Sequence, residues 1–249
     1  MFSIGDRQRV RDQILQLASS DARVVAAGVV GSLAHREGDR WSDLDLTFAV
    51  EAGVPVQDVL GDWTRRLADD LGAEILFDLP RGAAIYRVFL LPGCLQVDLS
   101  FKPAAVFATG GPNFELLFGE VLETAAAPPR ESRELFGYAV HHALRARFCI
   151  ERGRYWQAEY WISSLRDYTL SLACRIRGLL DYDGRGFDDL PPDVRDPFVE
   201  ALVSSLDRDE LLRALGSAIA GLLREADEVR DFAVTIEAQL HALTAEWDR

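Results

Sequence analysis

Cysteine is scarce in this chain of 249 residues, which contains only Cys94, Cys149 and Cys174. Their number is odd and no two of them have Cys-x-x-Cys spacing, so a disulfide framework and a cysteine zinc site are both excluded. The chain also lacks an apolar run long enough to span a bilayer, and its charged, amphipathic first residues do not resemble a signal peptide. We therefore expect a cytoplasmic protein without a membrane partner.

Basic residues are too few and too scattered to form a nucleic-acid surface. The formal net charge is −13, Lys102 is the only lysine, and neither half of the chain contains a basic block. Proteins that hold a long phosphate backbone need such a block, because much of their affinity comes from neutralised phosphates. The charge distribution predicts no nucleic-acid partner, and an acidic protein suits a small polycationic substrate.

Apolar residues make up 49% of the chain, which is enough for a packed core, and their spacing changes along it. In the first half helical spacing alternates with short strand-like runs, whereas after a linker at 125–129 the spacing is helical. The sequence therefore predicts an α+β fold in which an α+β domain is followed by a helical bundle. The expected strands are 23–30, 43–50, 74–79, 84–91 and 95–101, and the expected helices are 5–19, 56–71, 131–152, 154–180, 193–205, 207–224 and 226–246.

Two of the expected strands alternate cleanly between apolar and polar residues. Successive side chains of a strand point to opposite faces of its sheet. A sheet with one apolar and one polar face carries its helices on the apolar side only. The apolar set is Leu44, Leu46, Phe48 and Val50 with Leu95, Val97, Leu99 and Phe101; the polar set is Asp43, Asp45 and Thr47 with Gln96, Asp98, Ser100 and Lys102.

Three carboxylates lie on the polar faces of these strands. Asp43 and Asp45 are two residues apart, so their side chains leave the same face, and they repel each other unless a cation lies between them. If the strand of Asp98 is a neighbour, the three carboxylates converge into a site of the kind that binds two Mg²⁺ ions for displacement at phosphorus.

Gly31-Ser32 precedes this carboxylate pair at short range. A Gly-Ser turn offers backbone N–H groups to phosphate, while carboxylates offer oxygen ligands to Mg²⁺. Gly-Ser alone could be an ordinary turn, and for Asp-x-Asp alone a solvated edge strand is the favoured explanation. Their combination with Asp98 favours nucleotidyl transfer.

These motifs resemble the signature of the nucleotidyltransferase superfamily. The matching stretches are Gly31-Ser32, Ser42-Asp43-Leu44-Asp45-Leu46 and Val97-Asp98-Leu99, and the closer resemblance is to the bacterial antibiotic nucleotidyltransferases that modify aminoglycosides and lincosamides. The resemblance implies a catalytic domain with a mixed sheet over residues 1–125 and a helical substrate-binding bundle over 130–249. In the bundle, the stretch most similar to that family is Gly153-Arg154-Tyr155-Trp156-Gln157-Ala158.

The resemblance also implies roles for individual residues. Gly31 and Ser32 bind the triphosphate of an NTP, ATP first, while Asp43 and Asp45 bind two Mg²⁺ ions. Asp98 completes one metal site and is a candidate to accept the proton of the attacking hydroxyl. Arg36 and Arg40 are candidates for phosphate binding, although Glu37 departs from the Arg-Gly that often follows Gly-Ser in the family.

A small-molecule acceptor needs a second surface, which we expect on the helix at 154–180. Its aromatic and acidic residues away from the core stripe suggest a cleft in which aromatics stack on a ring and a carboxylate meets an amine. The candidates are Trp156, Glu159, Tyr160 and Asp167. Glu159 is a second candidate base. Contact of this face with the first domain or with a second subunit explains it equally well, so a homodimer stays open.

Two classes of function therefore remain open. The first is an enzyme that transfers a nucleoside monophosphate from an NTP to a hydroxyl of a small molecule and releases pyrophosphate. The alternative is an antitoxin-type or regulatory nucleotidyltransferase that acts on or binds a protein. The helical half lacks the Arg-x(4–6)-His motif of RNase-like partners, which disfavours an RNase. Neither the acceptor nor the nucleotide base follows from the sequence, because pocket shape decides them.

Overall fold

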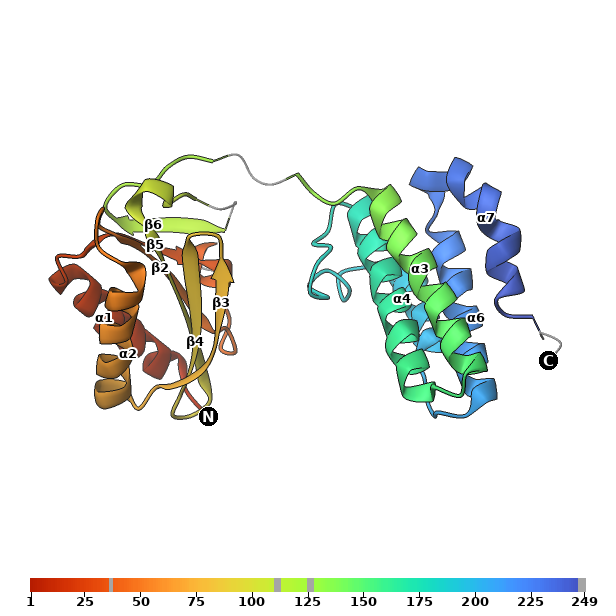
Figure 1. Ribbon diagram of the computed structural model, residues 1–249, viewed down its shortest axis with the longest axis horizontal. Helices are drawn as coiled ribbons and strands as arrows, with labels where there is room; N and C mark the ends of the chain where they lie inside the picture. Colours follow the sequence, from red (N-terminus) through yellow and green to blue (C-terminus); the bar gives the residue numbers. More distant parts are fainter. Residues whose placement is uncertain (36–37, 110–112, 125–127, 246–249) are drawn as a thin grey trace. The chain divides into compact units, whose positions relative to one another are not determined.

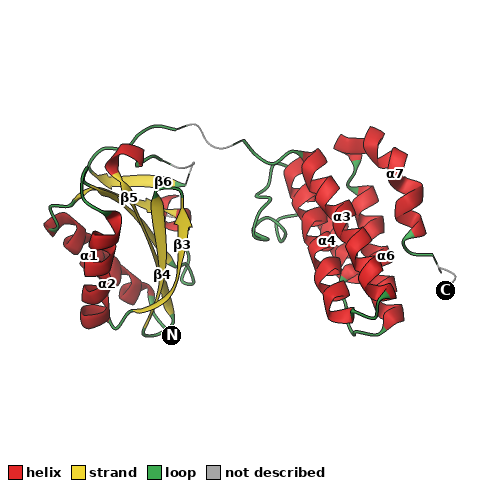
Figure 2. Ribbon diagram, in the orientation of Figure 1, coloured by secondary structure: helices red, strands yellow, loops and turns green. Residues whose placement is uncertain are grey.

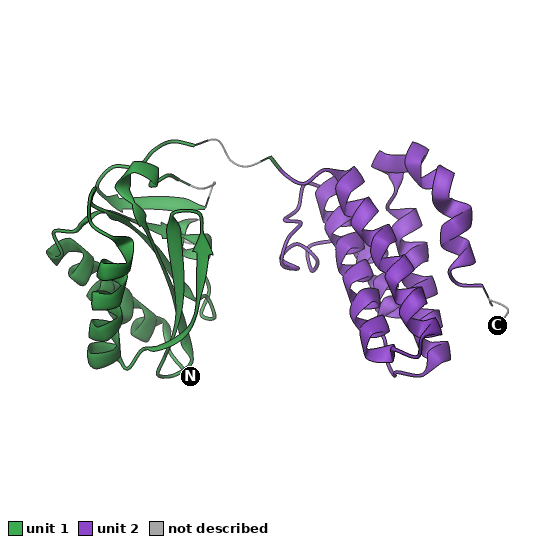
Figure 3. Ribbon diagram, viewed as in Figure 1, with its two compact units in different colours: residues 1–128 green, residues 129–249 purple. Residues whose placement is uncertain are grey.

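The chain forms two compact units in a computed structural model, Met1–Pro128 and Pro129–Arg249 (Figure 3). The structure describes residues 1–35, 38–109, 113–124 and 128–245. None of the helices within these ranges is both long and apolar enough to cross a membrane.

The first unit is built on one mixed sheet of six strands in the order β3-β4-β5-β2-β1-β6 (Figure 1). β2 and β5 run parallel, and the other neighbouring strands are antiparallel. The strands are β1 (Val24–Val30), β2 (Leu44–Val50), β3 (Glu74–Arg81), β4 (Ala84–Leu91), β5 (Leu95–Pro103) and β6 (Phe114–Phe118), and the helices are α1 (Ile4–Ser20) and α2 (Val56–Leu71), with 3₁₀ turns η1 (Gly31–His35) and η2 (Ala104–Val106).

Both long helices of this unit, α1 and α2, cover the same face of the sheet, as the alternation predicts (Figure 2). Phe48 and Phe101 from adjacent strands meet the indole of Trp63 on α2, with ring centroids 4.9 and 5.1 Å from it. Burying such apolar side chains contributes about 1.5–3 kcal/mol each, and this drives the layer together. Among the described residues of this unit, no long helix covers the polar face (Figure 2).

Part of the polar face is nevertheless buried. Thr47 and Ser100, each 2% exposed, are joined by a hydroxyl–hydroxyl hydrogen bond of 2.7 Å between β2 and β5. Beyond them Phe107 packs on alanines of β1 and β2. The carboxylate end of the face is therefore separated from this small cluster by a satisfied polar pair.

Strand β6 is an element that the sequence analysis did not predict. It pairs antiparallel with β1, with Leu116 opposite Gly28. Gly28 allows the Phe114 ring to cross β1, because a Cβ there would lie 2.5 Å from that ring. The short run Phe-Glu-Leu-Leu-Phe has no clean alternation, so its place depends on this contact rather than on a local pattern.

The second unit is a helical bundle, as predicted. Its core joins the inner faces of its four longer helices. The elements are α3 (Ser132–Glu151), α4 (Tyr155–Ile176), α5 (Pro192–Arg195), η3 (Asp196–Ala201), α6 (Arg208–Arg224), η4 (Asp227–Val229) and α7 (Arg230–Ala242).

Three predicted helices of this unit differ from the structure. The helix expected at 154–180 ends at Ile176, because Gly178 takes the left-handed φ of 70° that ends helices. The helix expected at 193–205 is a single α turn followed by a 3₁₀ turn, into which Pro197 brings no N–H donor. The last predicted helix begins as the 3₁₀ turn η4, and α7 ends at Ala242.

Candidate functional site

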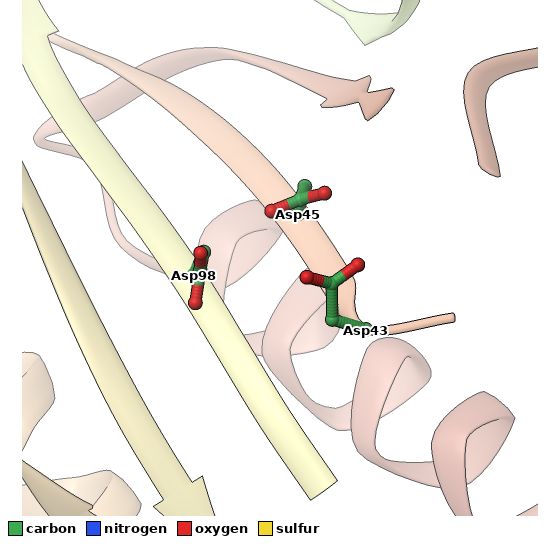
Figure 4. A group of neighbouring side chains, drawn as sticks. All are labelled: Asp43, Asp45 and Asp98. Carbon is green, nitrogen blue, oxygen red and sulfur yellow. The ribbon is translucent and has the colours of Figure 1, made fainter. Parts of the chain in front are cut away.

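Three carboxylates converge on the polar face of the first unit. Asp45 and Asp98 are opposite one another in the parallel register of β2 and β5, and Asp43 comes directly before β2. Oxygen atoms of all three lie within 4.8 Å of one another (Figure 4). The adjacency of β2 and β5, which the sequence analysis left as a condition, brings together the carboxylates that the sequence singled out.

The electrostatics of this cluster favour a cation. All three residues are half-buried. Burial raises the pKa of the Asp98 carboxyl above its ordinary value and the charge of Asp43 raises it further, while hydrogen bonds from the Gln96 amide, 3.1 and 3.2 Å long, oppose the shift. Converging carboxylate oxygens are the donor set that Mg²⁺ prefers, and a bound divalent cation would remove the repulsion between them. The residues therefore fit a divalent metal.

Gly31 lies against this cluster for a steric reason. Its φ is +75°, and a Cβ at this position would be 2.6 Å from Oδ2 of Asp45. Glycine is needed both for the left-handed backbone and for the close approach of the carboxylate. The two motifs that the sequence analysis joined are thus in direct contact.

The Gly31 N–H is not offered to a ligand, contrary to expectation. It donates to the Asn113 carbonyl over 3.2 Å, which ties the start of η1 to the β6 segment. Phosphate binding by this turn would therefore depend on the residues that follow, beginning with Ser32. A hollow of about 450 Å³ adjoins the cluster, and it is lined by Phe2, Ser32, Asp39, Trp41, Ser42, Asp43, Cys94 and Gln96.

Of the two arginines predicted to bind phosphate, the structure describes Arg40. The Arg40 guanidinium lies 4.5 Å from the ring centroid of Trp41, a residue that is 61% exposed and lines the hollow. Arg40 is therefore beside the hollow and is held by a cation–π contact. Arg36 and its neighbour Glu37 lie outside the described residues.

The predicted acceptor residues lie on α4 of the second unit. Trp156 and Tyr160 are 77% and 60% exposed, and Glu159 accepts a 2.7 Å hydrogen bond from the Ser163 hydroxyl. Asp167 accepts a hydrogen bond from the Arg166 guanidinium over 2.9 Å. Of the predicted four, Asp167 lines a hollow of about 360 Å³, together with Tyr168 and Tyr182 among others. That these four residues bind an acceptor stays a prediction.

Arg7 and Gln96 are neighbours of the site that the sequence analysis missed. Gln96 shares its strand face with Asp98, and that alternation could have identified it. Arg7 is only 6% exposed although it is charged and lies on an amphipathic helix. A charge on such a helix is ordinarily interpreted as solvated, so no local signal marked it.

The chain was compared with family models, curated proteins and solved structures. No protein-family model and no curated protein matches the chain. Among solved structures, an aminoglycoside 6-adenyltransferase from Bacillus subtilis is 11% identical with a TM-score of 0.41, and the match covers 96% of this chain and 99% of that one. A likeness this weak decides neither the fold nor the activity, which rest on the residues of the chain itself.

Proposed function

We propose that the chain is a divalent-metal-dependent nucleotidyltransferase, which transfers a nucleoside monophosphate from an NTP to a hydroxyl acceptor and releases pyrophosphate. The observation that carries the proposal is the convergence of Asp43, Asp45 and Asp98 within 4.8 Å, with Gly31 in contact with Asp45. A solvated edge strand does not explain this arrangement, because β2 and β5 are interior strands of the sheet.

Asp43, Asp45 and Asp98 would hold Mg²⁺, and we propose two ions. When bound, the metal supplies positive charge at the triphosphate and offsets the charge that develops there during transfer. Ser32 and the hollow beside the cluster would receive the triphosphate. Arg40 is placed to add a positive charge beside that hollow.

The transfer forms a bond between the acceptor oxygen and the α-phosphorus, and it breaks the bond from that phosphorus to the leaving pyrophosphate. The acceptor proton goes to a carboxylate, for which we propose Asp98. The Asp98 carboxylate lies within 4.8 Å of those of Asp43 and Asp45, beside the place where the α-phosphate would be held. Glu159 is the alternative base, although its carboxylate is engaged by Ser163.

For the acceptor we propose a small molecule, with an aminoglycoside or lincosamide as the first candidates and ATP as the first donor. The support is the motif resemblance together with the net charge of −13, which suits a cationic acceptor. A protein acceptor, as in antitoxin-type enzymes, is the second candidate. The exposed aromatic rings of Trp156 and Tyr160 favour it, because exposed aromatics mark interaction surfaces.

To test the proposal, the full chain is incubated with Mg²⁺, an acceptor panel and each α-³²P-labelled NTP in turn. An Asp45→Asn variant is assayed in parallel as the control. Label that moves to one acceptor, and is lost in the variant, supports the enzyme and names its substrate. Label that moves to a protein in a lysate favours the second candidate. If no label moves but triphosphate binding still requires Asp45, the antibiotic assignment is the part to abandon.

A further inference from the structure

Asp43 is held differently from the other two carboxylates of the cluster. Asp45 and Asp98 are paired in the β2–β5 ladder, whose register begins at Leu44. Asp43 precedes that first pair, so no strand pairing fixes its backbone. Three carboxylates at this spacing repel one another without a cation, and Asp43 is the member that would move away. Its position must come from the segment before it.

That segment, residues 38–42, is closed by its own hydrogen bonds. The Asp39 carboxylate accepts from the Trp41 N–H over 2.8 Å and from the Ser42 hydroxyl over 3.1 Å. The Asp39 N–H in turn donates to the Ser42 hydroxyl over 3.0 Å. Asp39 and Ser42 therefore form a small closed loop that ends directly at Asp43.

Arg7 attaches this loop to the body of the unit. Its Nη1 donates to the carbonyls of Asp39 and Ser42 over 2.8 and 2.6 Å, although they lie 32 and 35 residues away. Burying a guanidinium to 6% exposure is costly unless it is hydrogen-bonded. The loop carbonyls supply those bonds, so the loop and the arginine stabilise each other.

The helix that carries Arg7 is itself rigid. A capping box between Ser3 and Asp6 fixes its first turn, and Ile14 and Ala18 are buried in the core under the sheet. The loop also rests on η1, because a Cβ at Gly38 would be 2.2 Å from Cδ2 of Leu33. Contacts from α1 and η1 therefore restrict the loop.

We propose that Arg7 is a positioning residue for metal binding: through the loop at 38–42 it holds Asp43 beside Asp45 and Asp98. The proposal rests on the metal site of the proposed function. Arg7 touches neither metal nor substrate in this account, and its effect passes entirely through the Asp39 and Ser42 carbonyls. Losing outer-shell partners of a metal site typically costs about 10–100-fold in metal affinity.

The test measures Mn²⁺ affinity by electron paramagnetic resonance on the full chain, without nucleotide or acceptor. We expect Arg7→Met to weaken Mn²⁺ binding about tenfold or more, and Arg7→Lys to recover part of the loss because it keeps a donor. Arg11→Met is the matched control: Arg11 lies one turn further along α1 and lines the same hollow as Arg7. The Mn²⁺ affinity of Arg11→Met should equal that of the wild type.

A second variant keeps the proposal testable if Arg7→Met does not fold. Ser42→Ala removes the two hydrogen bonds that the Ser42 hydroxyl makes with Asp39, keeps the bond from the Trp41 N–H and leaves Arg7 in place. It should weaken Mn²⁺ binding several-fold. In transfer assays Arg7→Met should regain a near wild-type kcat at high Mg²⁺, with a raised KM for the metal, which a mere loss of folded protein would not produce.

Two results separate the possible failures. Wild-type Mn²⁺ affinity in folded Arg7→Met, or in Ser42→Ala if the first variant does not fold, would overturn the role of Arg7 and leave the proposed function intact. Absence of Asp45-dependent Mn²⁺ binding in the wild type would overturn the metal site itself, and the inference with it.

Discussion

The two units differ in how directly their structures point to a chemical role. In the first unit, two adjacent strands place Asp45 and Asp98 side by side, so pairing positions functional groups to within ångströms. In the second unit the core is also buried, but the residues singled out on α4 lie on one helix, and Trp156 and Tyr160 among them are exposed. Pairing between strands determines which side chains lie side by side. A position on a helix face determines only the direction in which a side chain points.

Among the substitutions that test this comparison between the two units, Asp98→Asn should have the largest effect on activity. Asp98→Asn should lower transfer about 100-fold or more, because it removes a metal ligand and the proposed base. The same change should raise the unfolding free energy of the metal-free protein by roughly 1 kcal/mol, because a half-buried charge beside Asp43 disappears. Urea denaturation in EDTA measures the stability, and a less stable variant would contradict the account.

A second prediction concerns the contact between the turn and the carboxylates. Gly31→Ala should weaken metal binding and lower the unfolding free energy by roughly 1–3 kcal/mol, since the methyl would meet Asp45 and the φ of +75° strains alanine. Gly53→Ala is the control, because its φ of +86° has nothing within 4 Å of the added carbon. Equal metal affinity in the two variants would show that the contact with Asp45 is unimportant.

The second unit should respond to pH through His142. Burial lowers the pKa of this imidazole below its ordinary value, and the neighbouring His141 acts in the same direction. Because the folded state prefers neutral His142, stability is fully present above pH ~6.5 and falls as the pH drops below it. His142→Phe should reduce this loss between pH 7.5 and 5.5 in chemical denaturation followed by circular dichroism. An unchanged pH dependence would place its origin elsewhere.

The smallest effect is expected on the outer face of α4. Tyr160→Ala should change the unfolding free energy by less than about 0.5 kcal/mol, because the ring is 60% exposed. If the face binds the acceptor, the variant should raise the acceptor KM several-fold and leave NTP binding unchanged. Loss of NTP affinity instead would show that the residue does not belong to an acceptor site.

Strand patterning carried most of what the sequence predicted. The alternation around Asp45 and Asp98 identified the two faces of the sheet and the cluster, because a period of two leaves little freedom. Strand β6 escaped prediction because its position depends on Phe114 crossing Gly28, which is a tertiary contact. The Gly31 N–H was misjudged for the same reason, since its acceptor, Asn113, is remote in sequence.

Arg7 shows the same limit for charged residues. Its position on α1 is consistent with a solvated face, and only the fold reveals that two loop carbonyls surround its Nη1. In the bundle, Gly178 and Pro197 were visible in the sequence, but how far each one shortens its helix depends on packing. Long-range hydrogen bonds are therefore what the sequence pattern left out.

The measurement that tests the central claim most directly compares ATP labelled with ³²P at the α position with ATP labelled at the γ position, under the same Mg²⁺ and acceptor conditions. Nucleotidyl transfer by the Asp43, Asp45 and Asp98 cluster predicts that α label appears on the acceptor and γ label in pyrophosphate, with both signals lost in Asp45→Asn. Label from the γ position on the acceptor, or transfer that persists in Asp45→Asn, would contradict it.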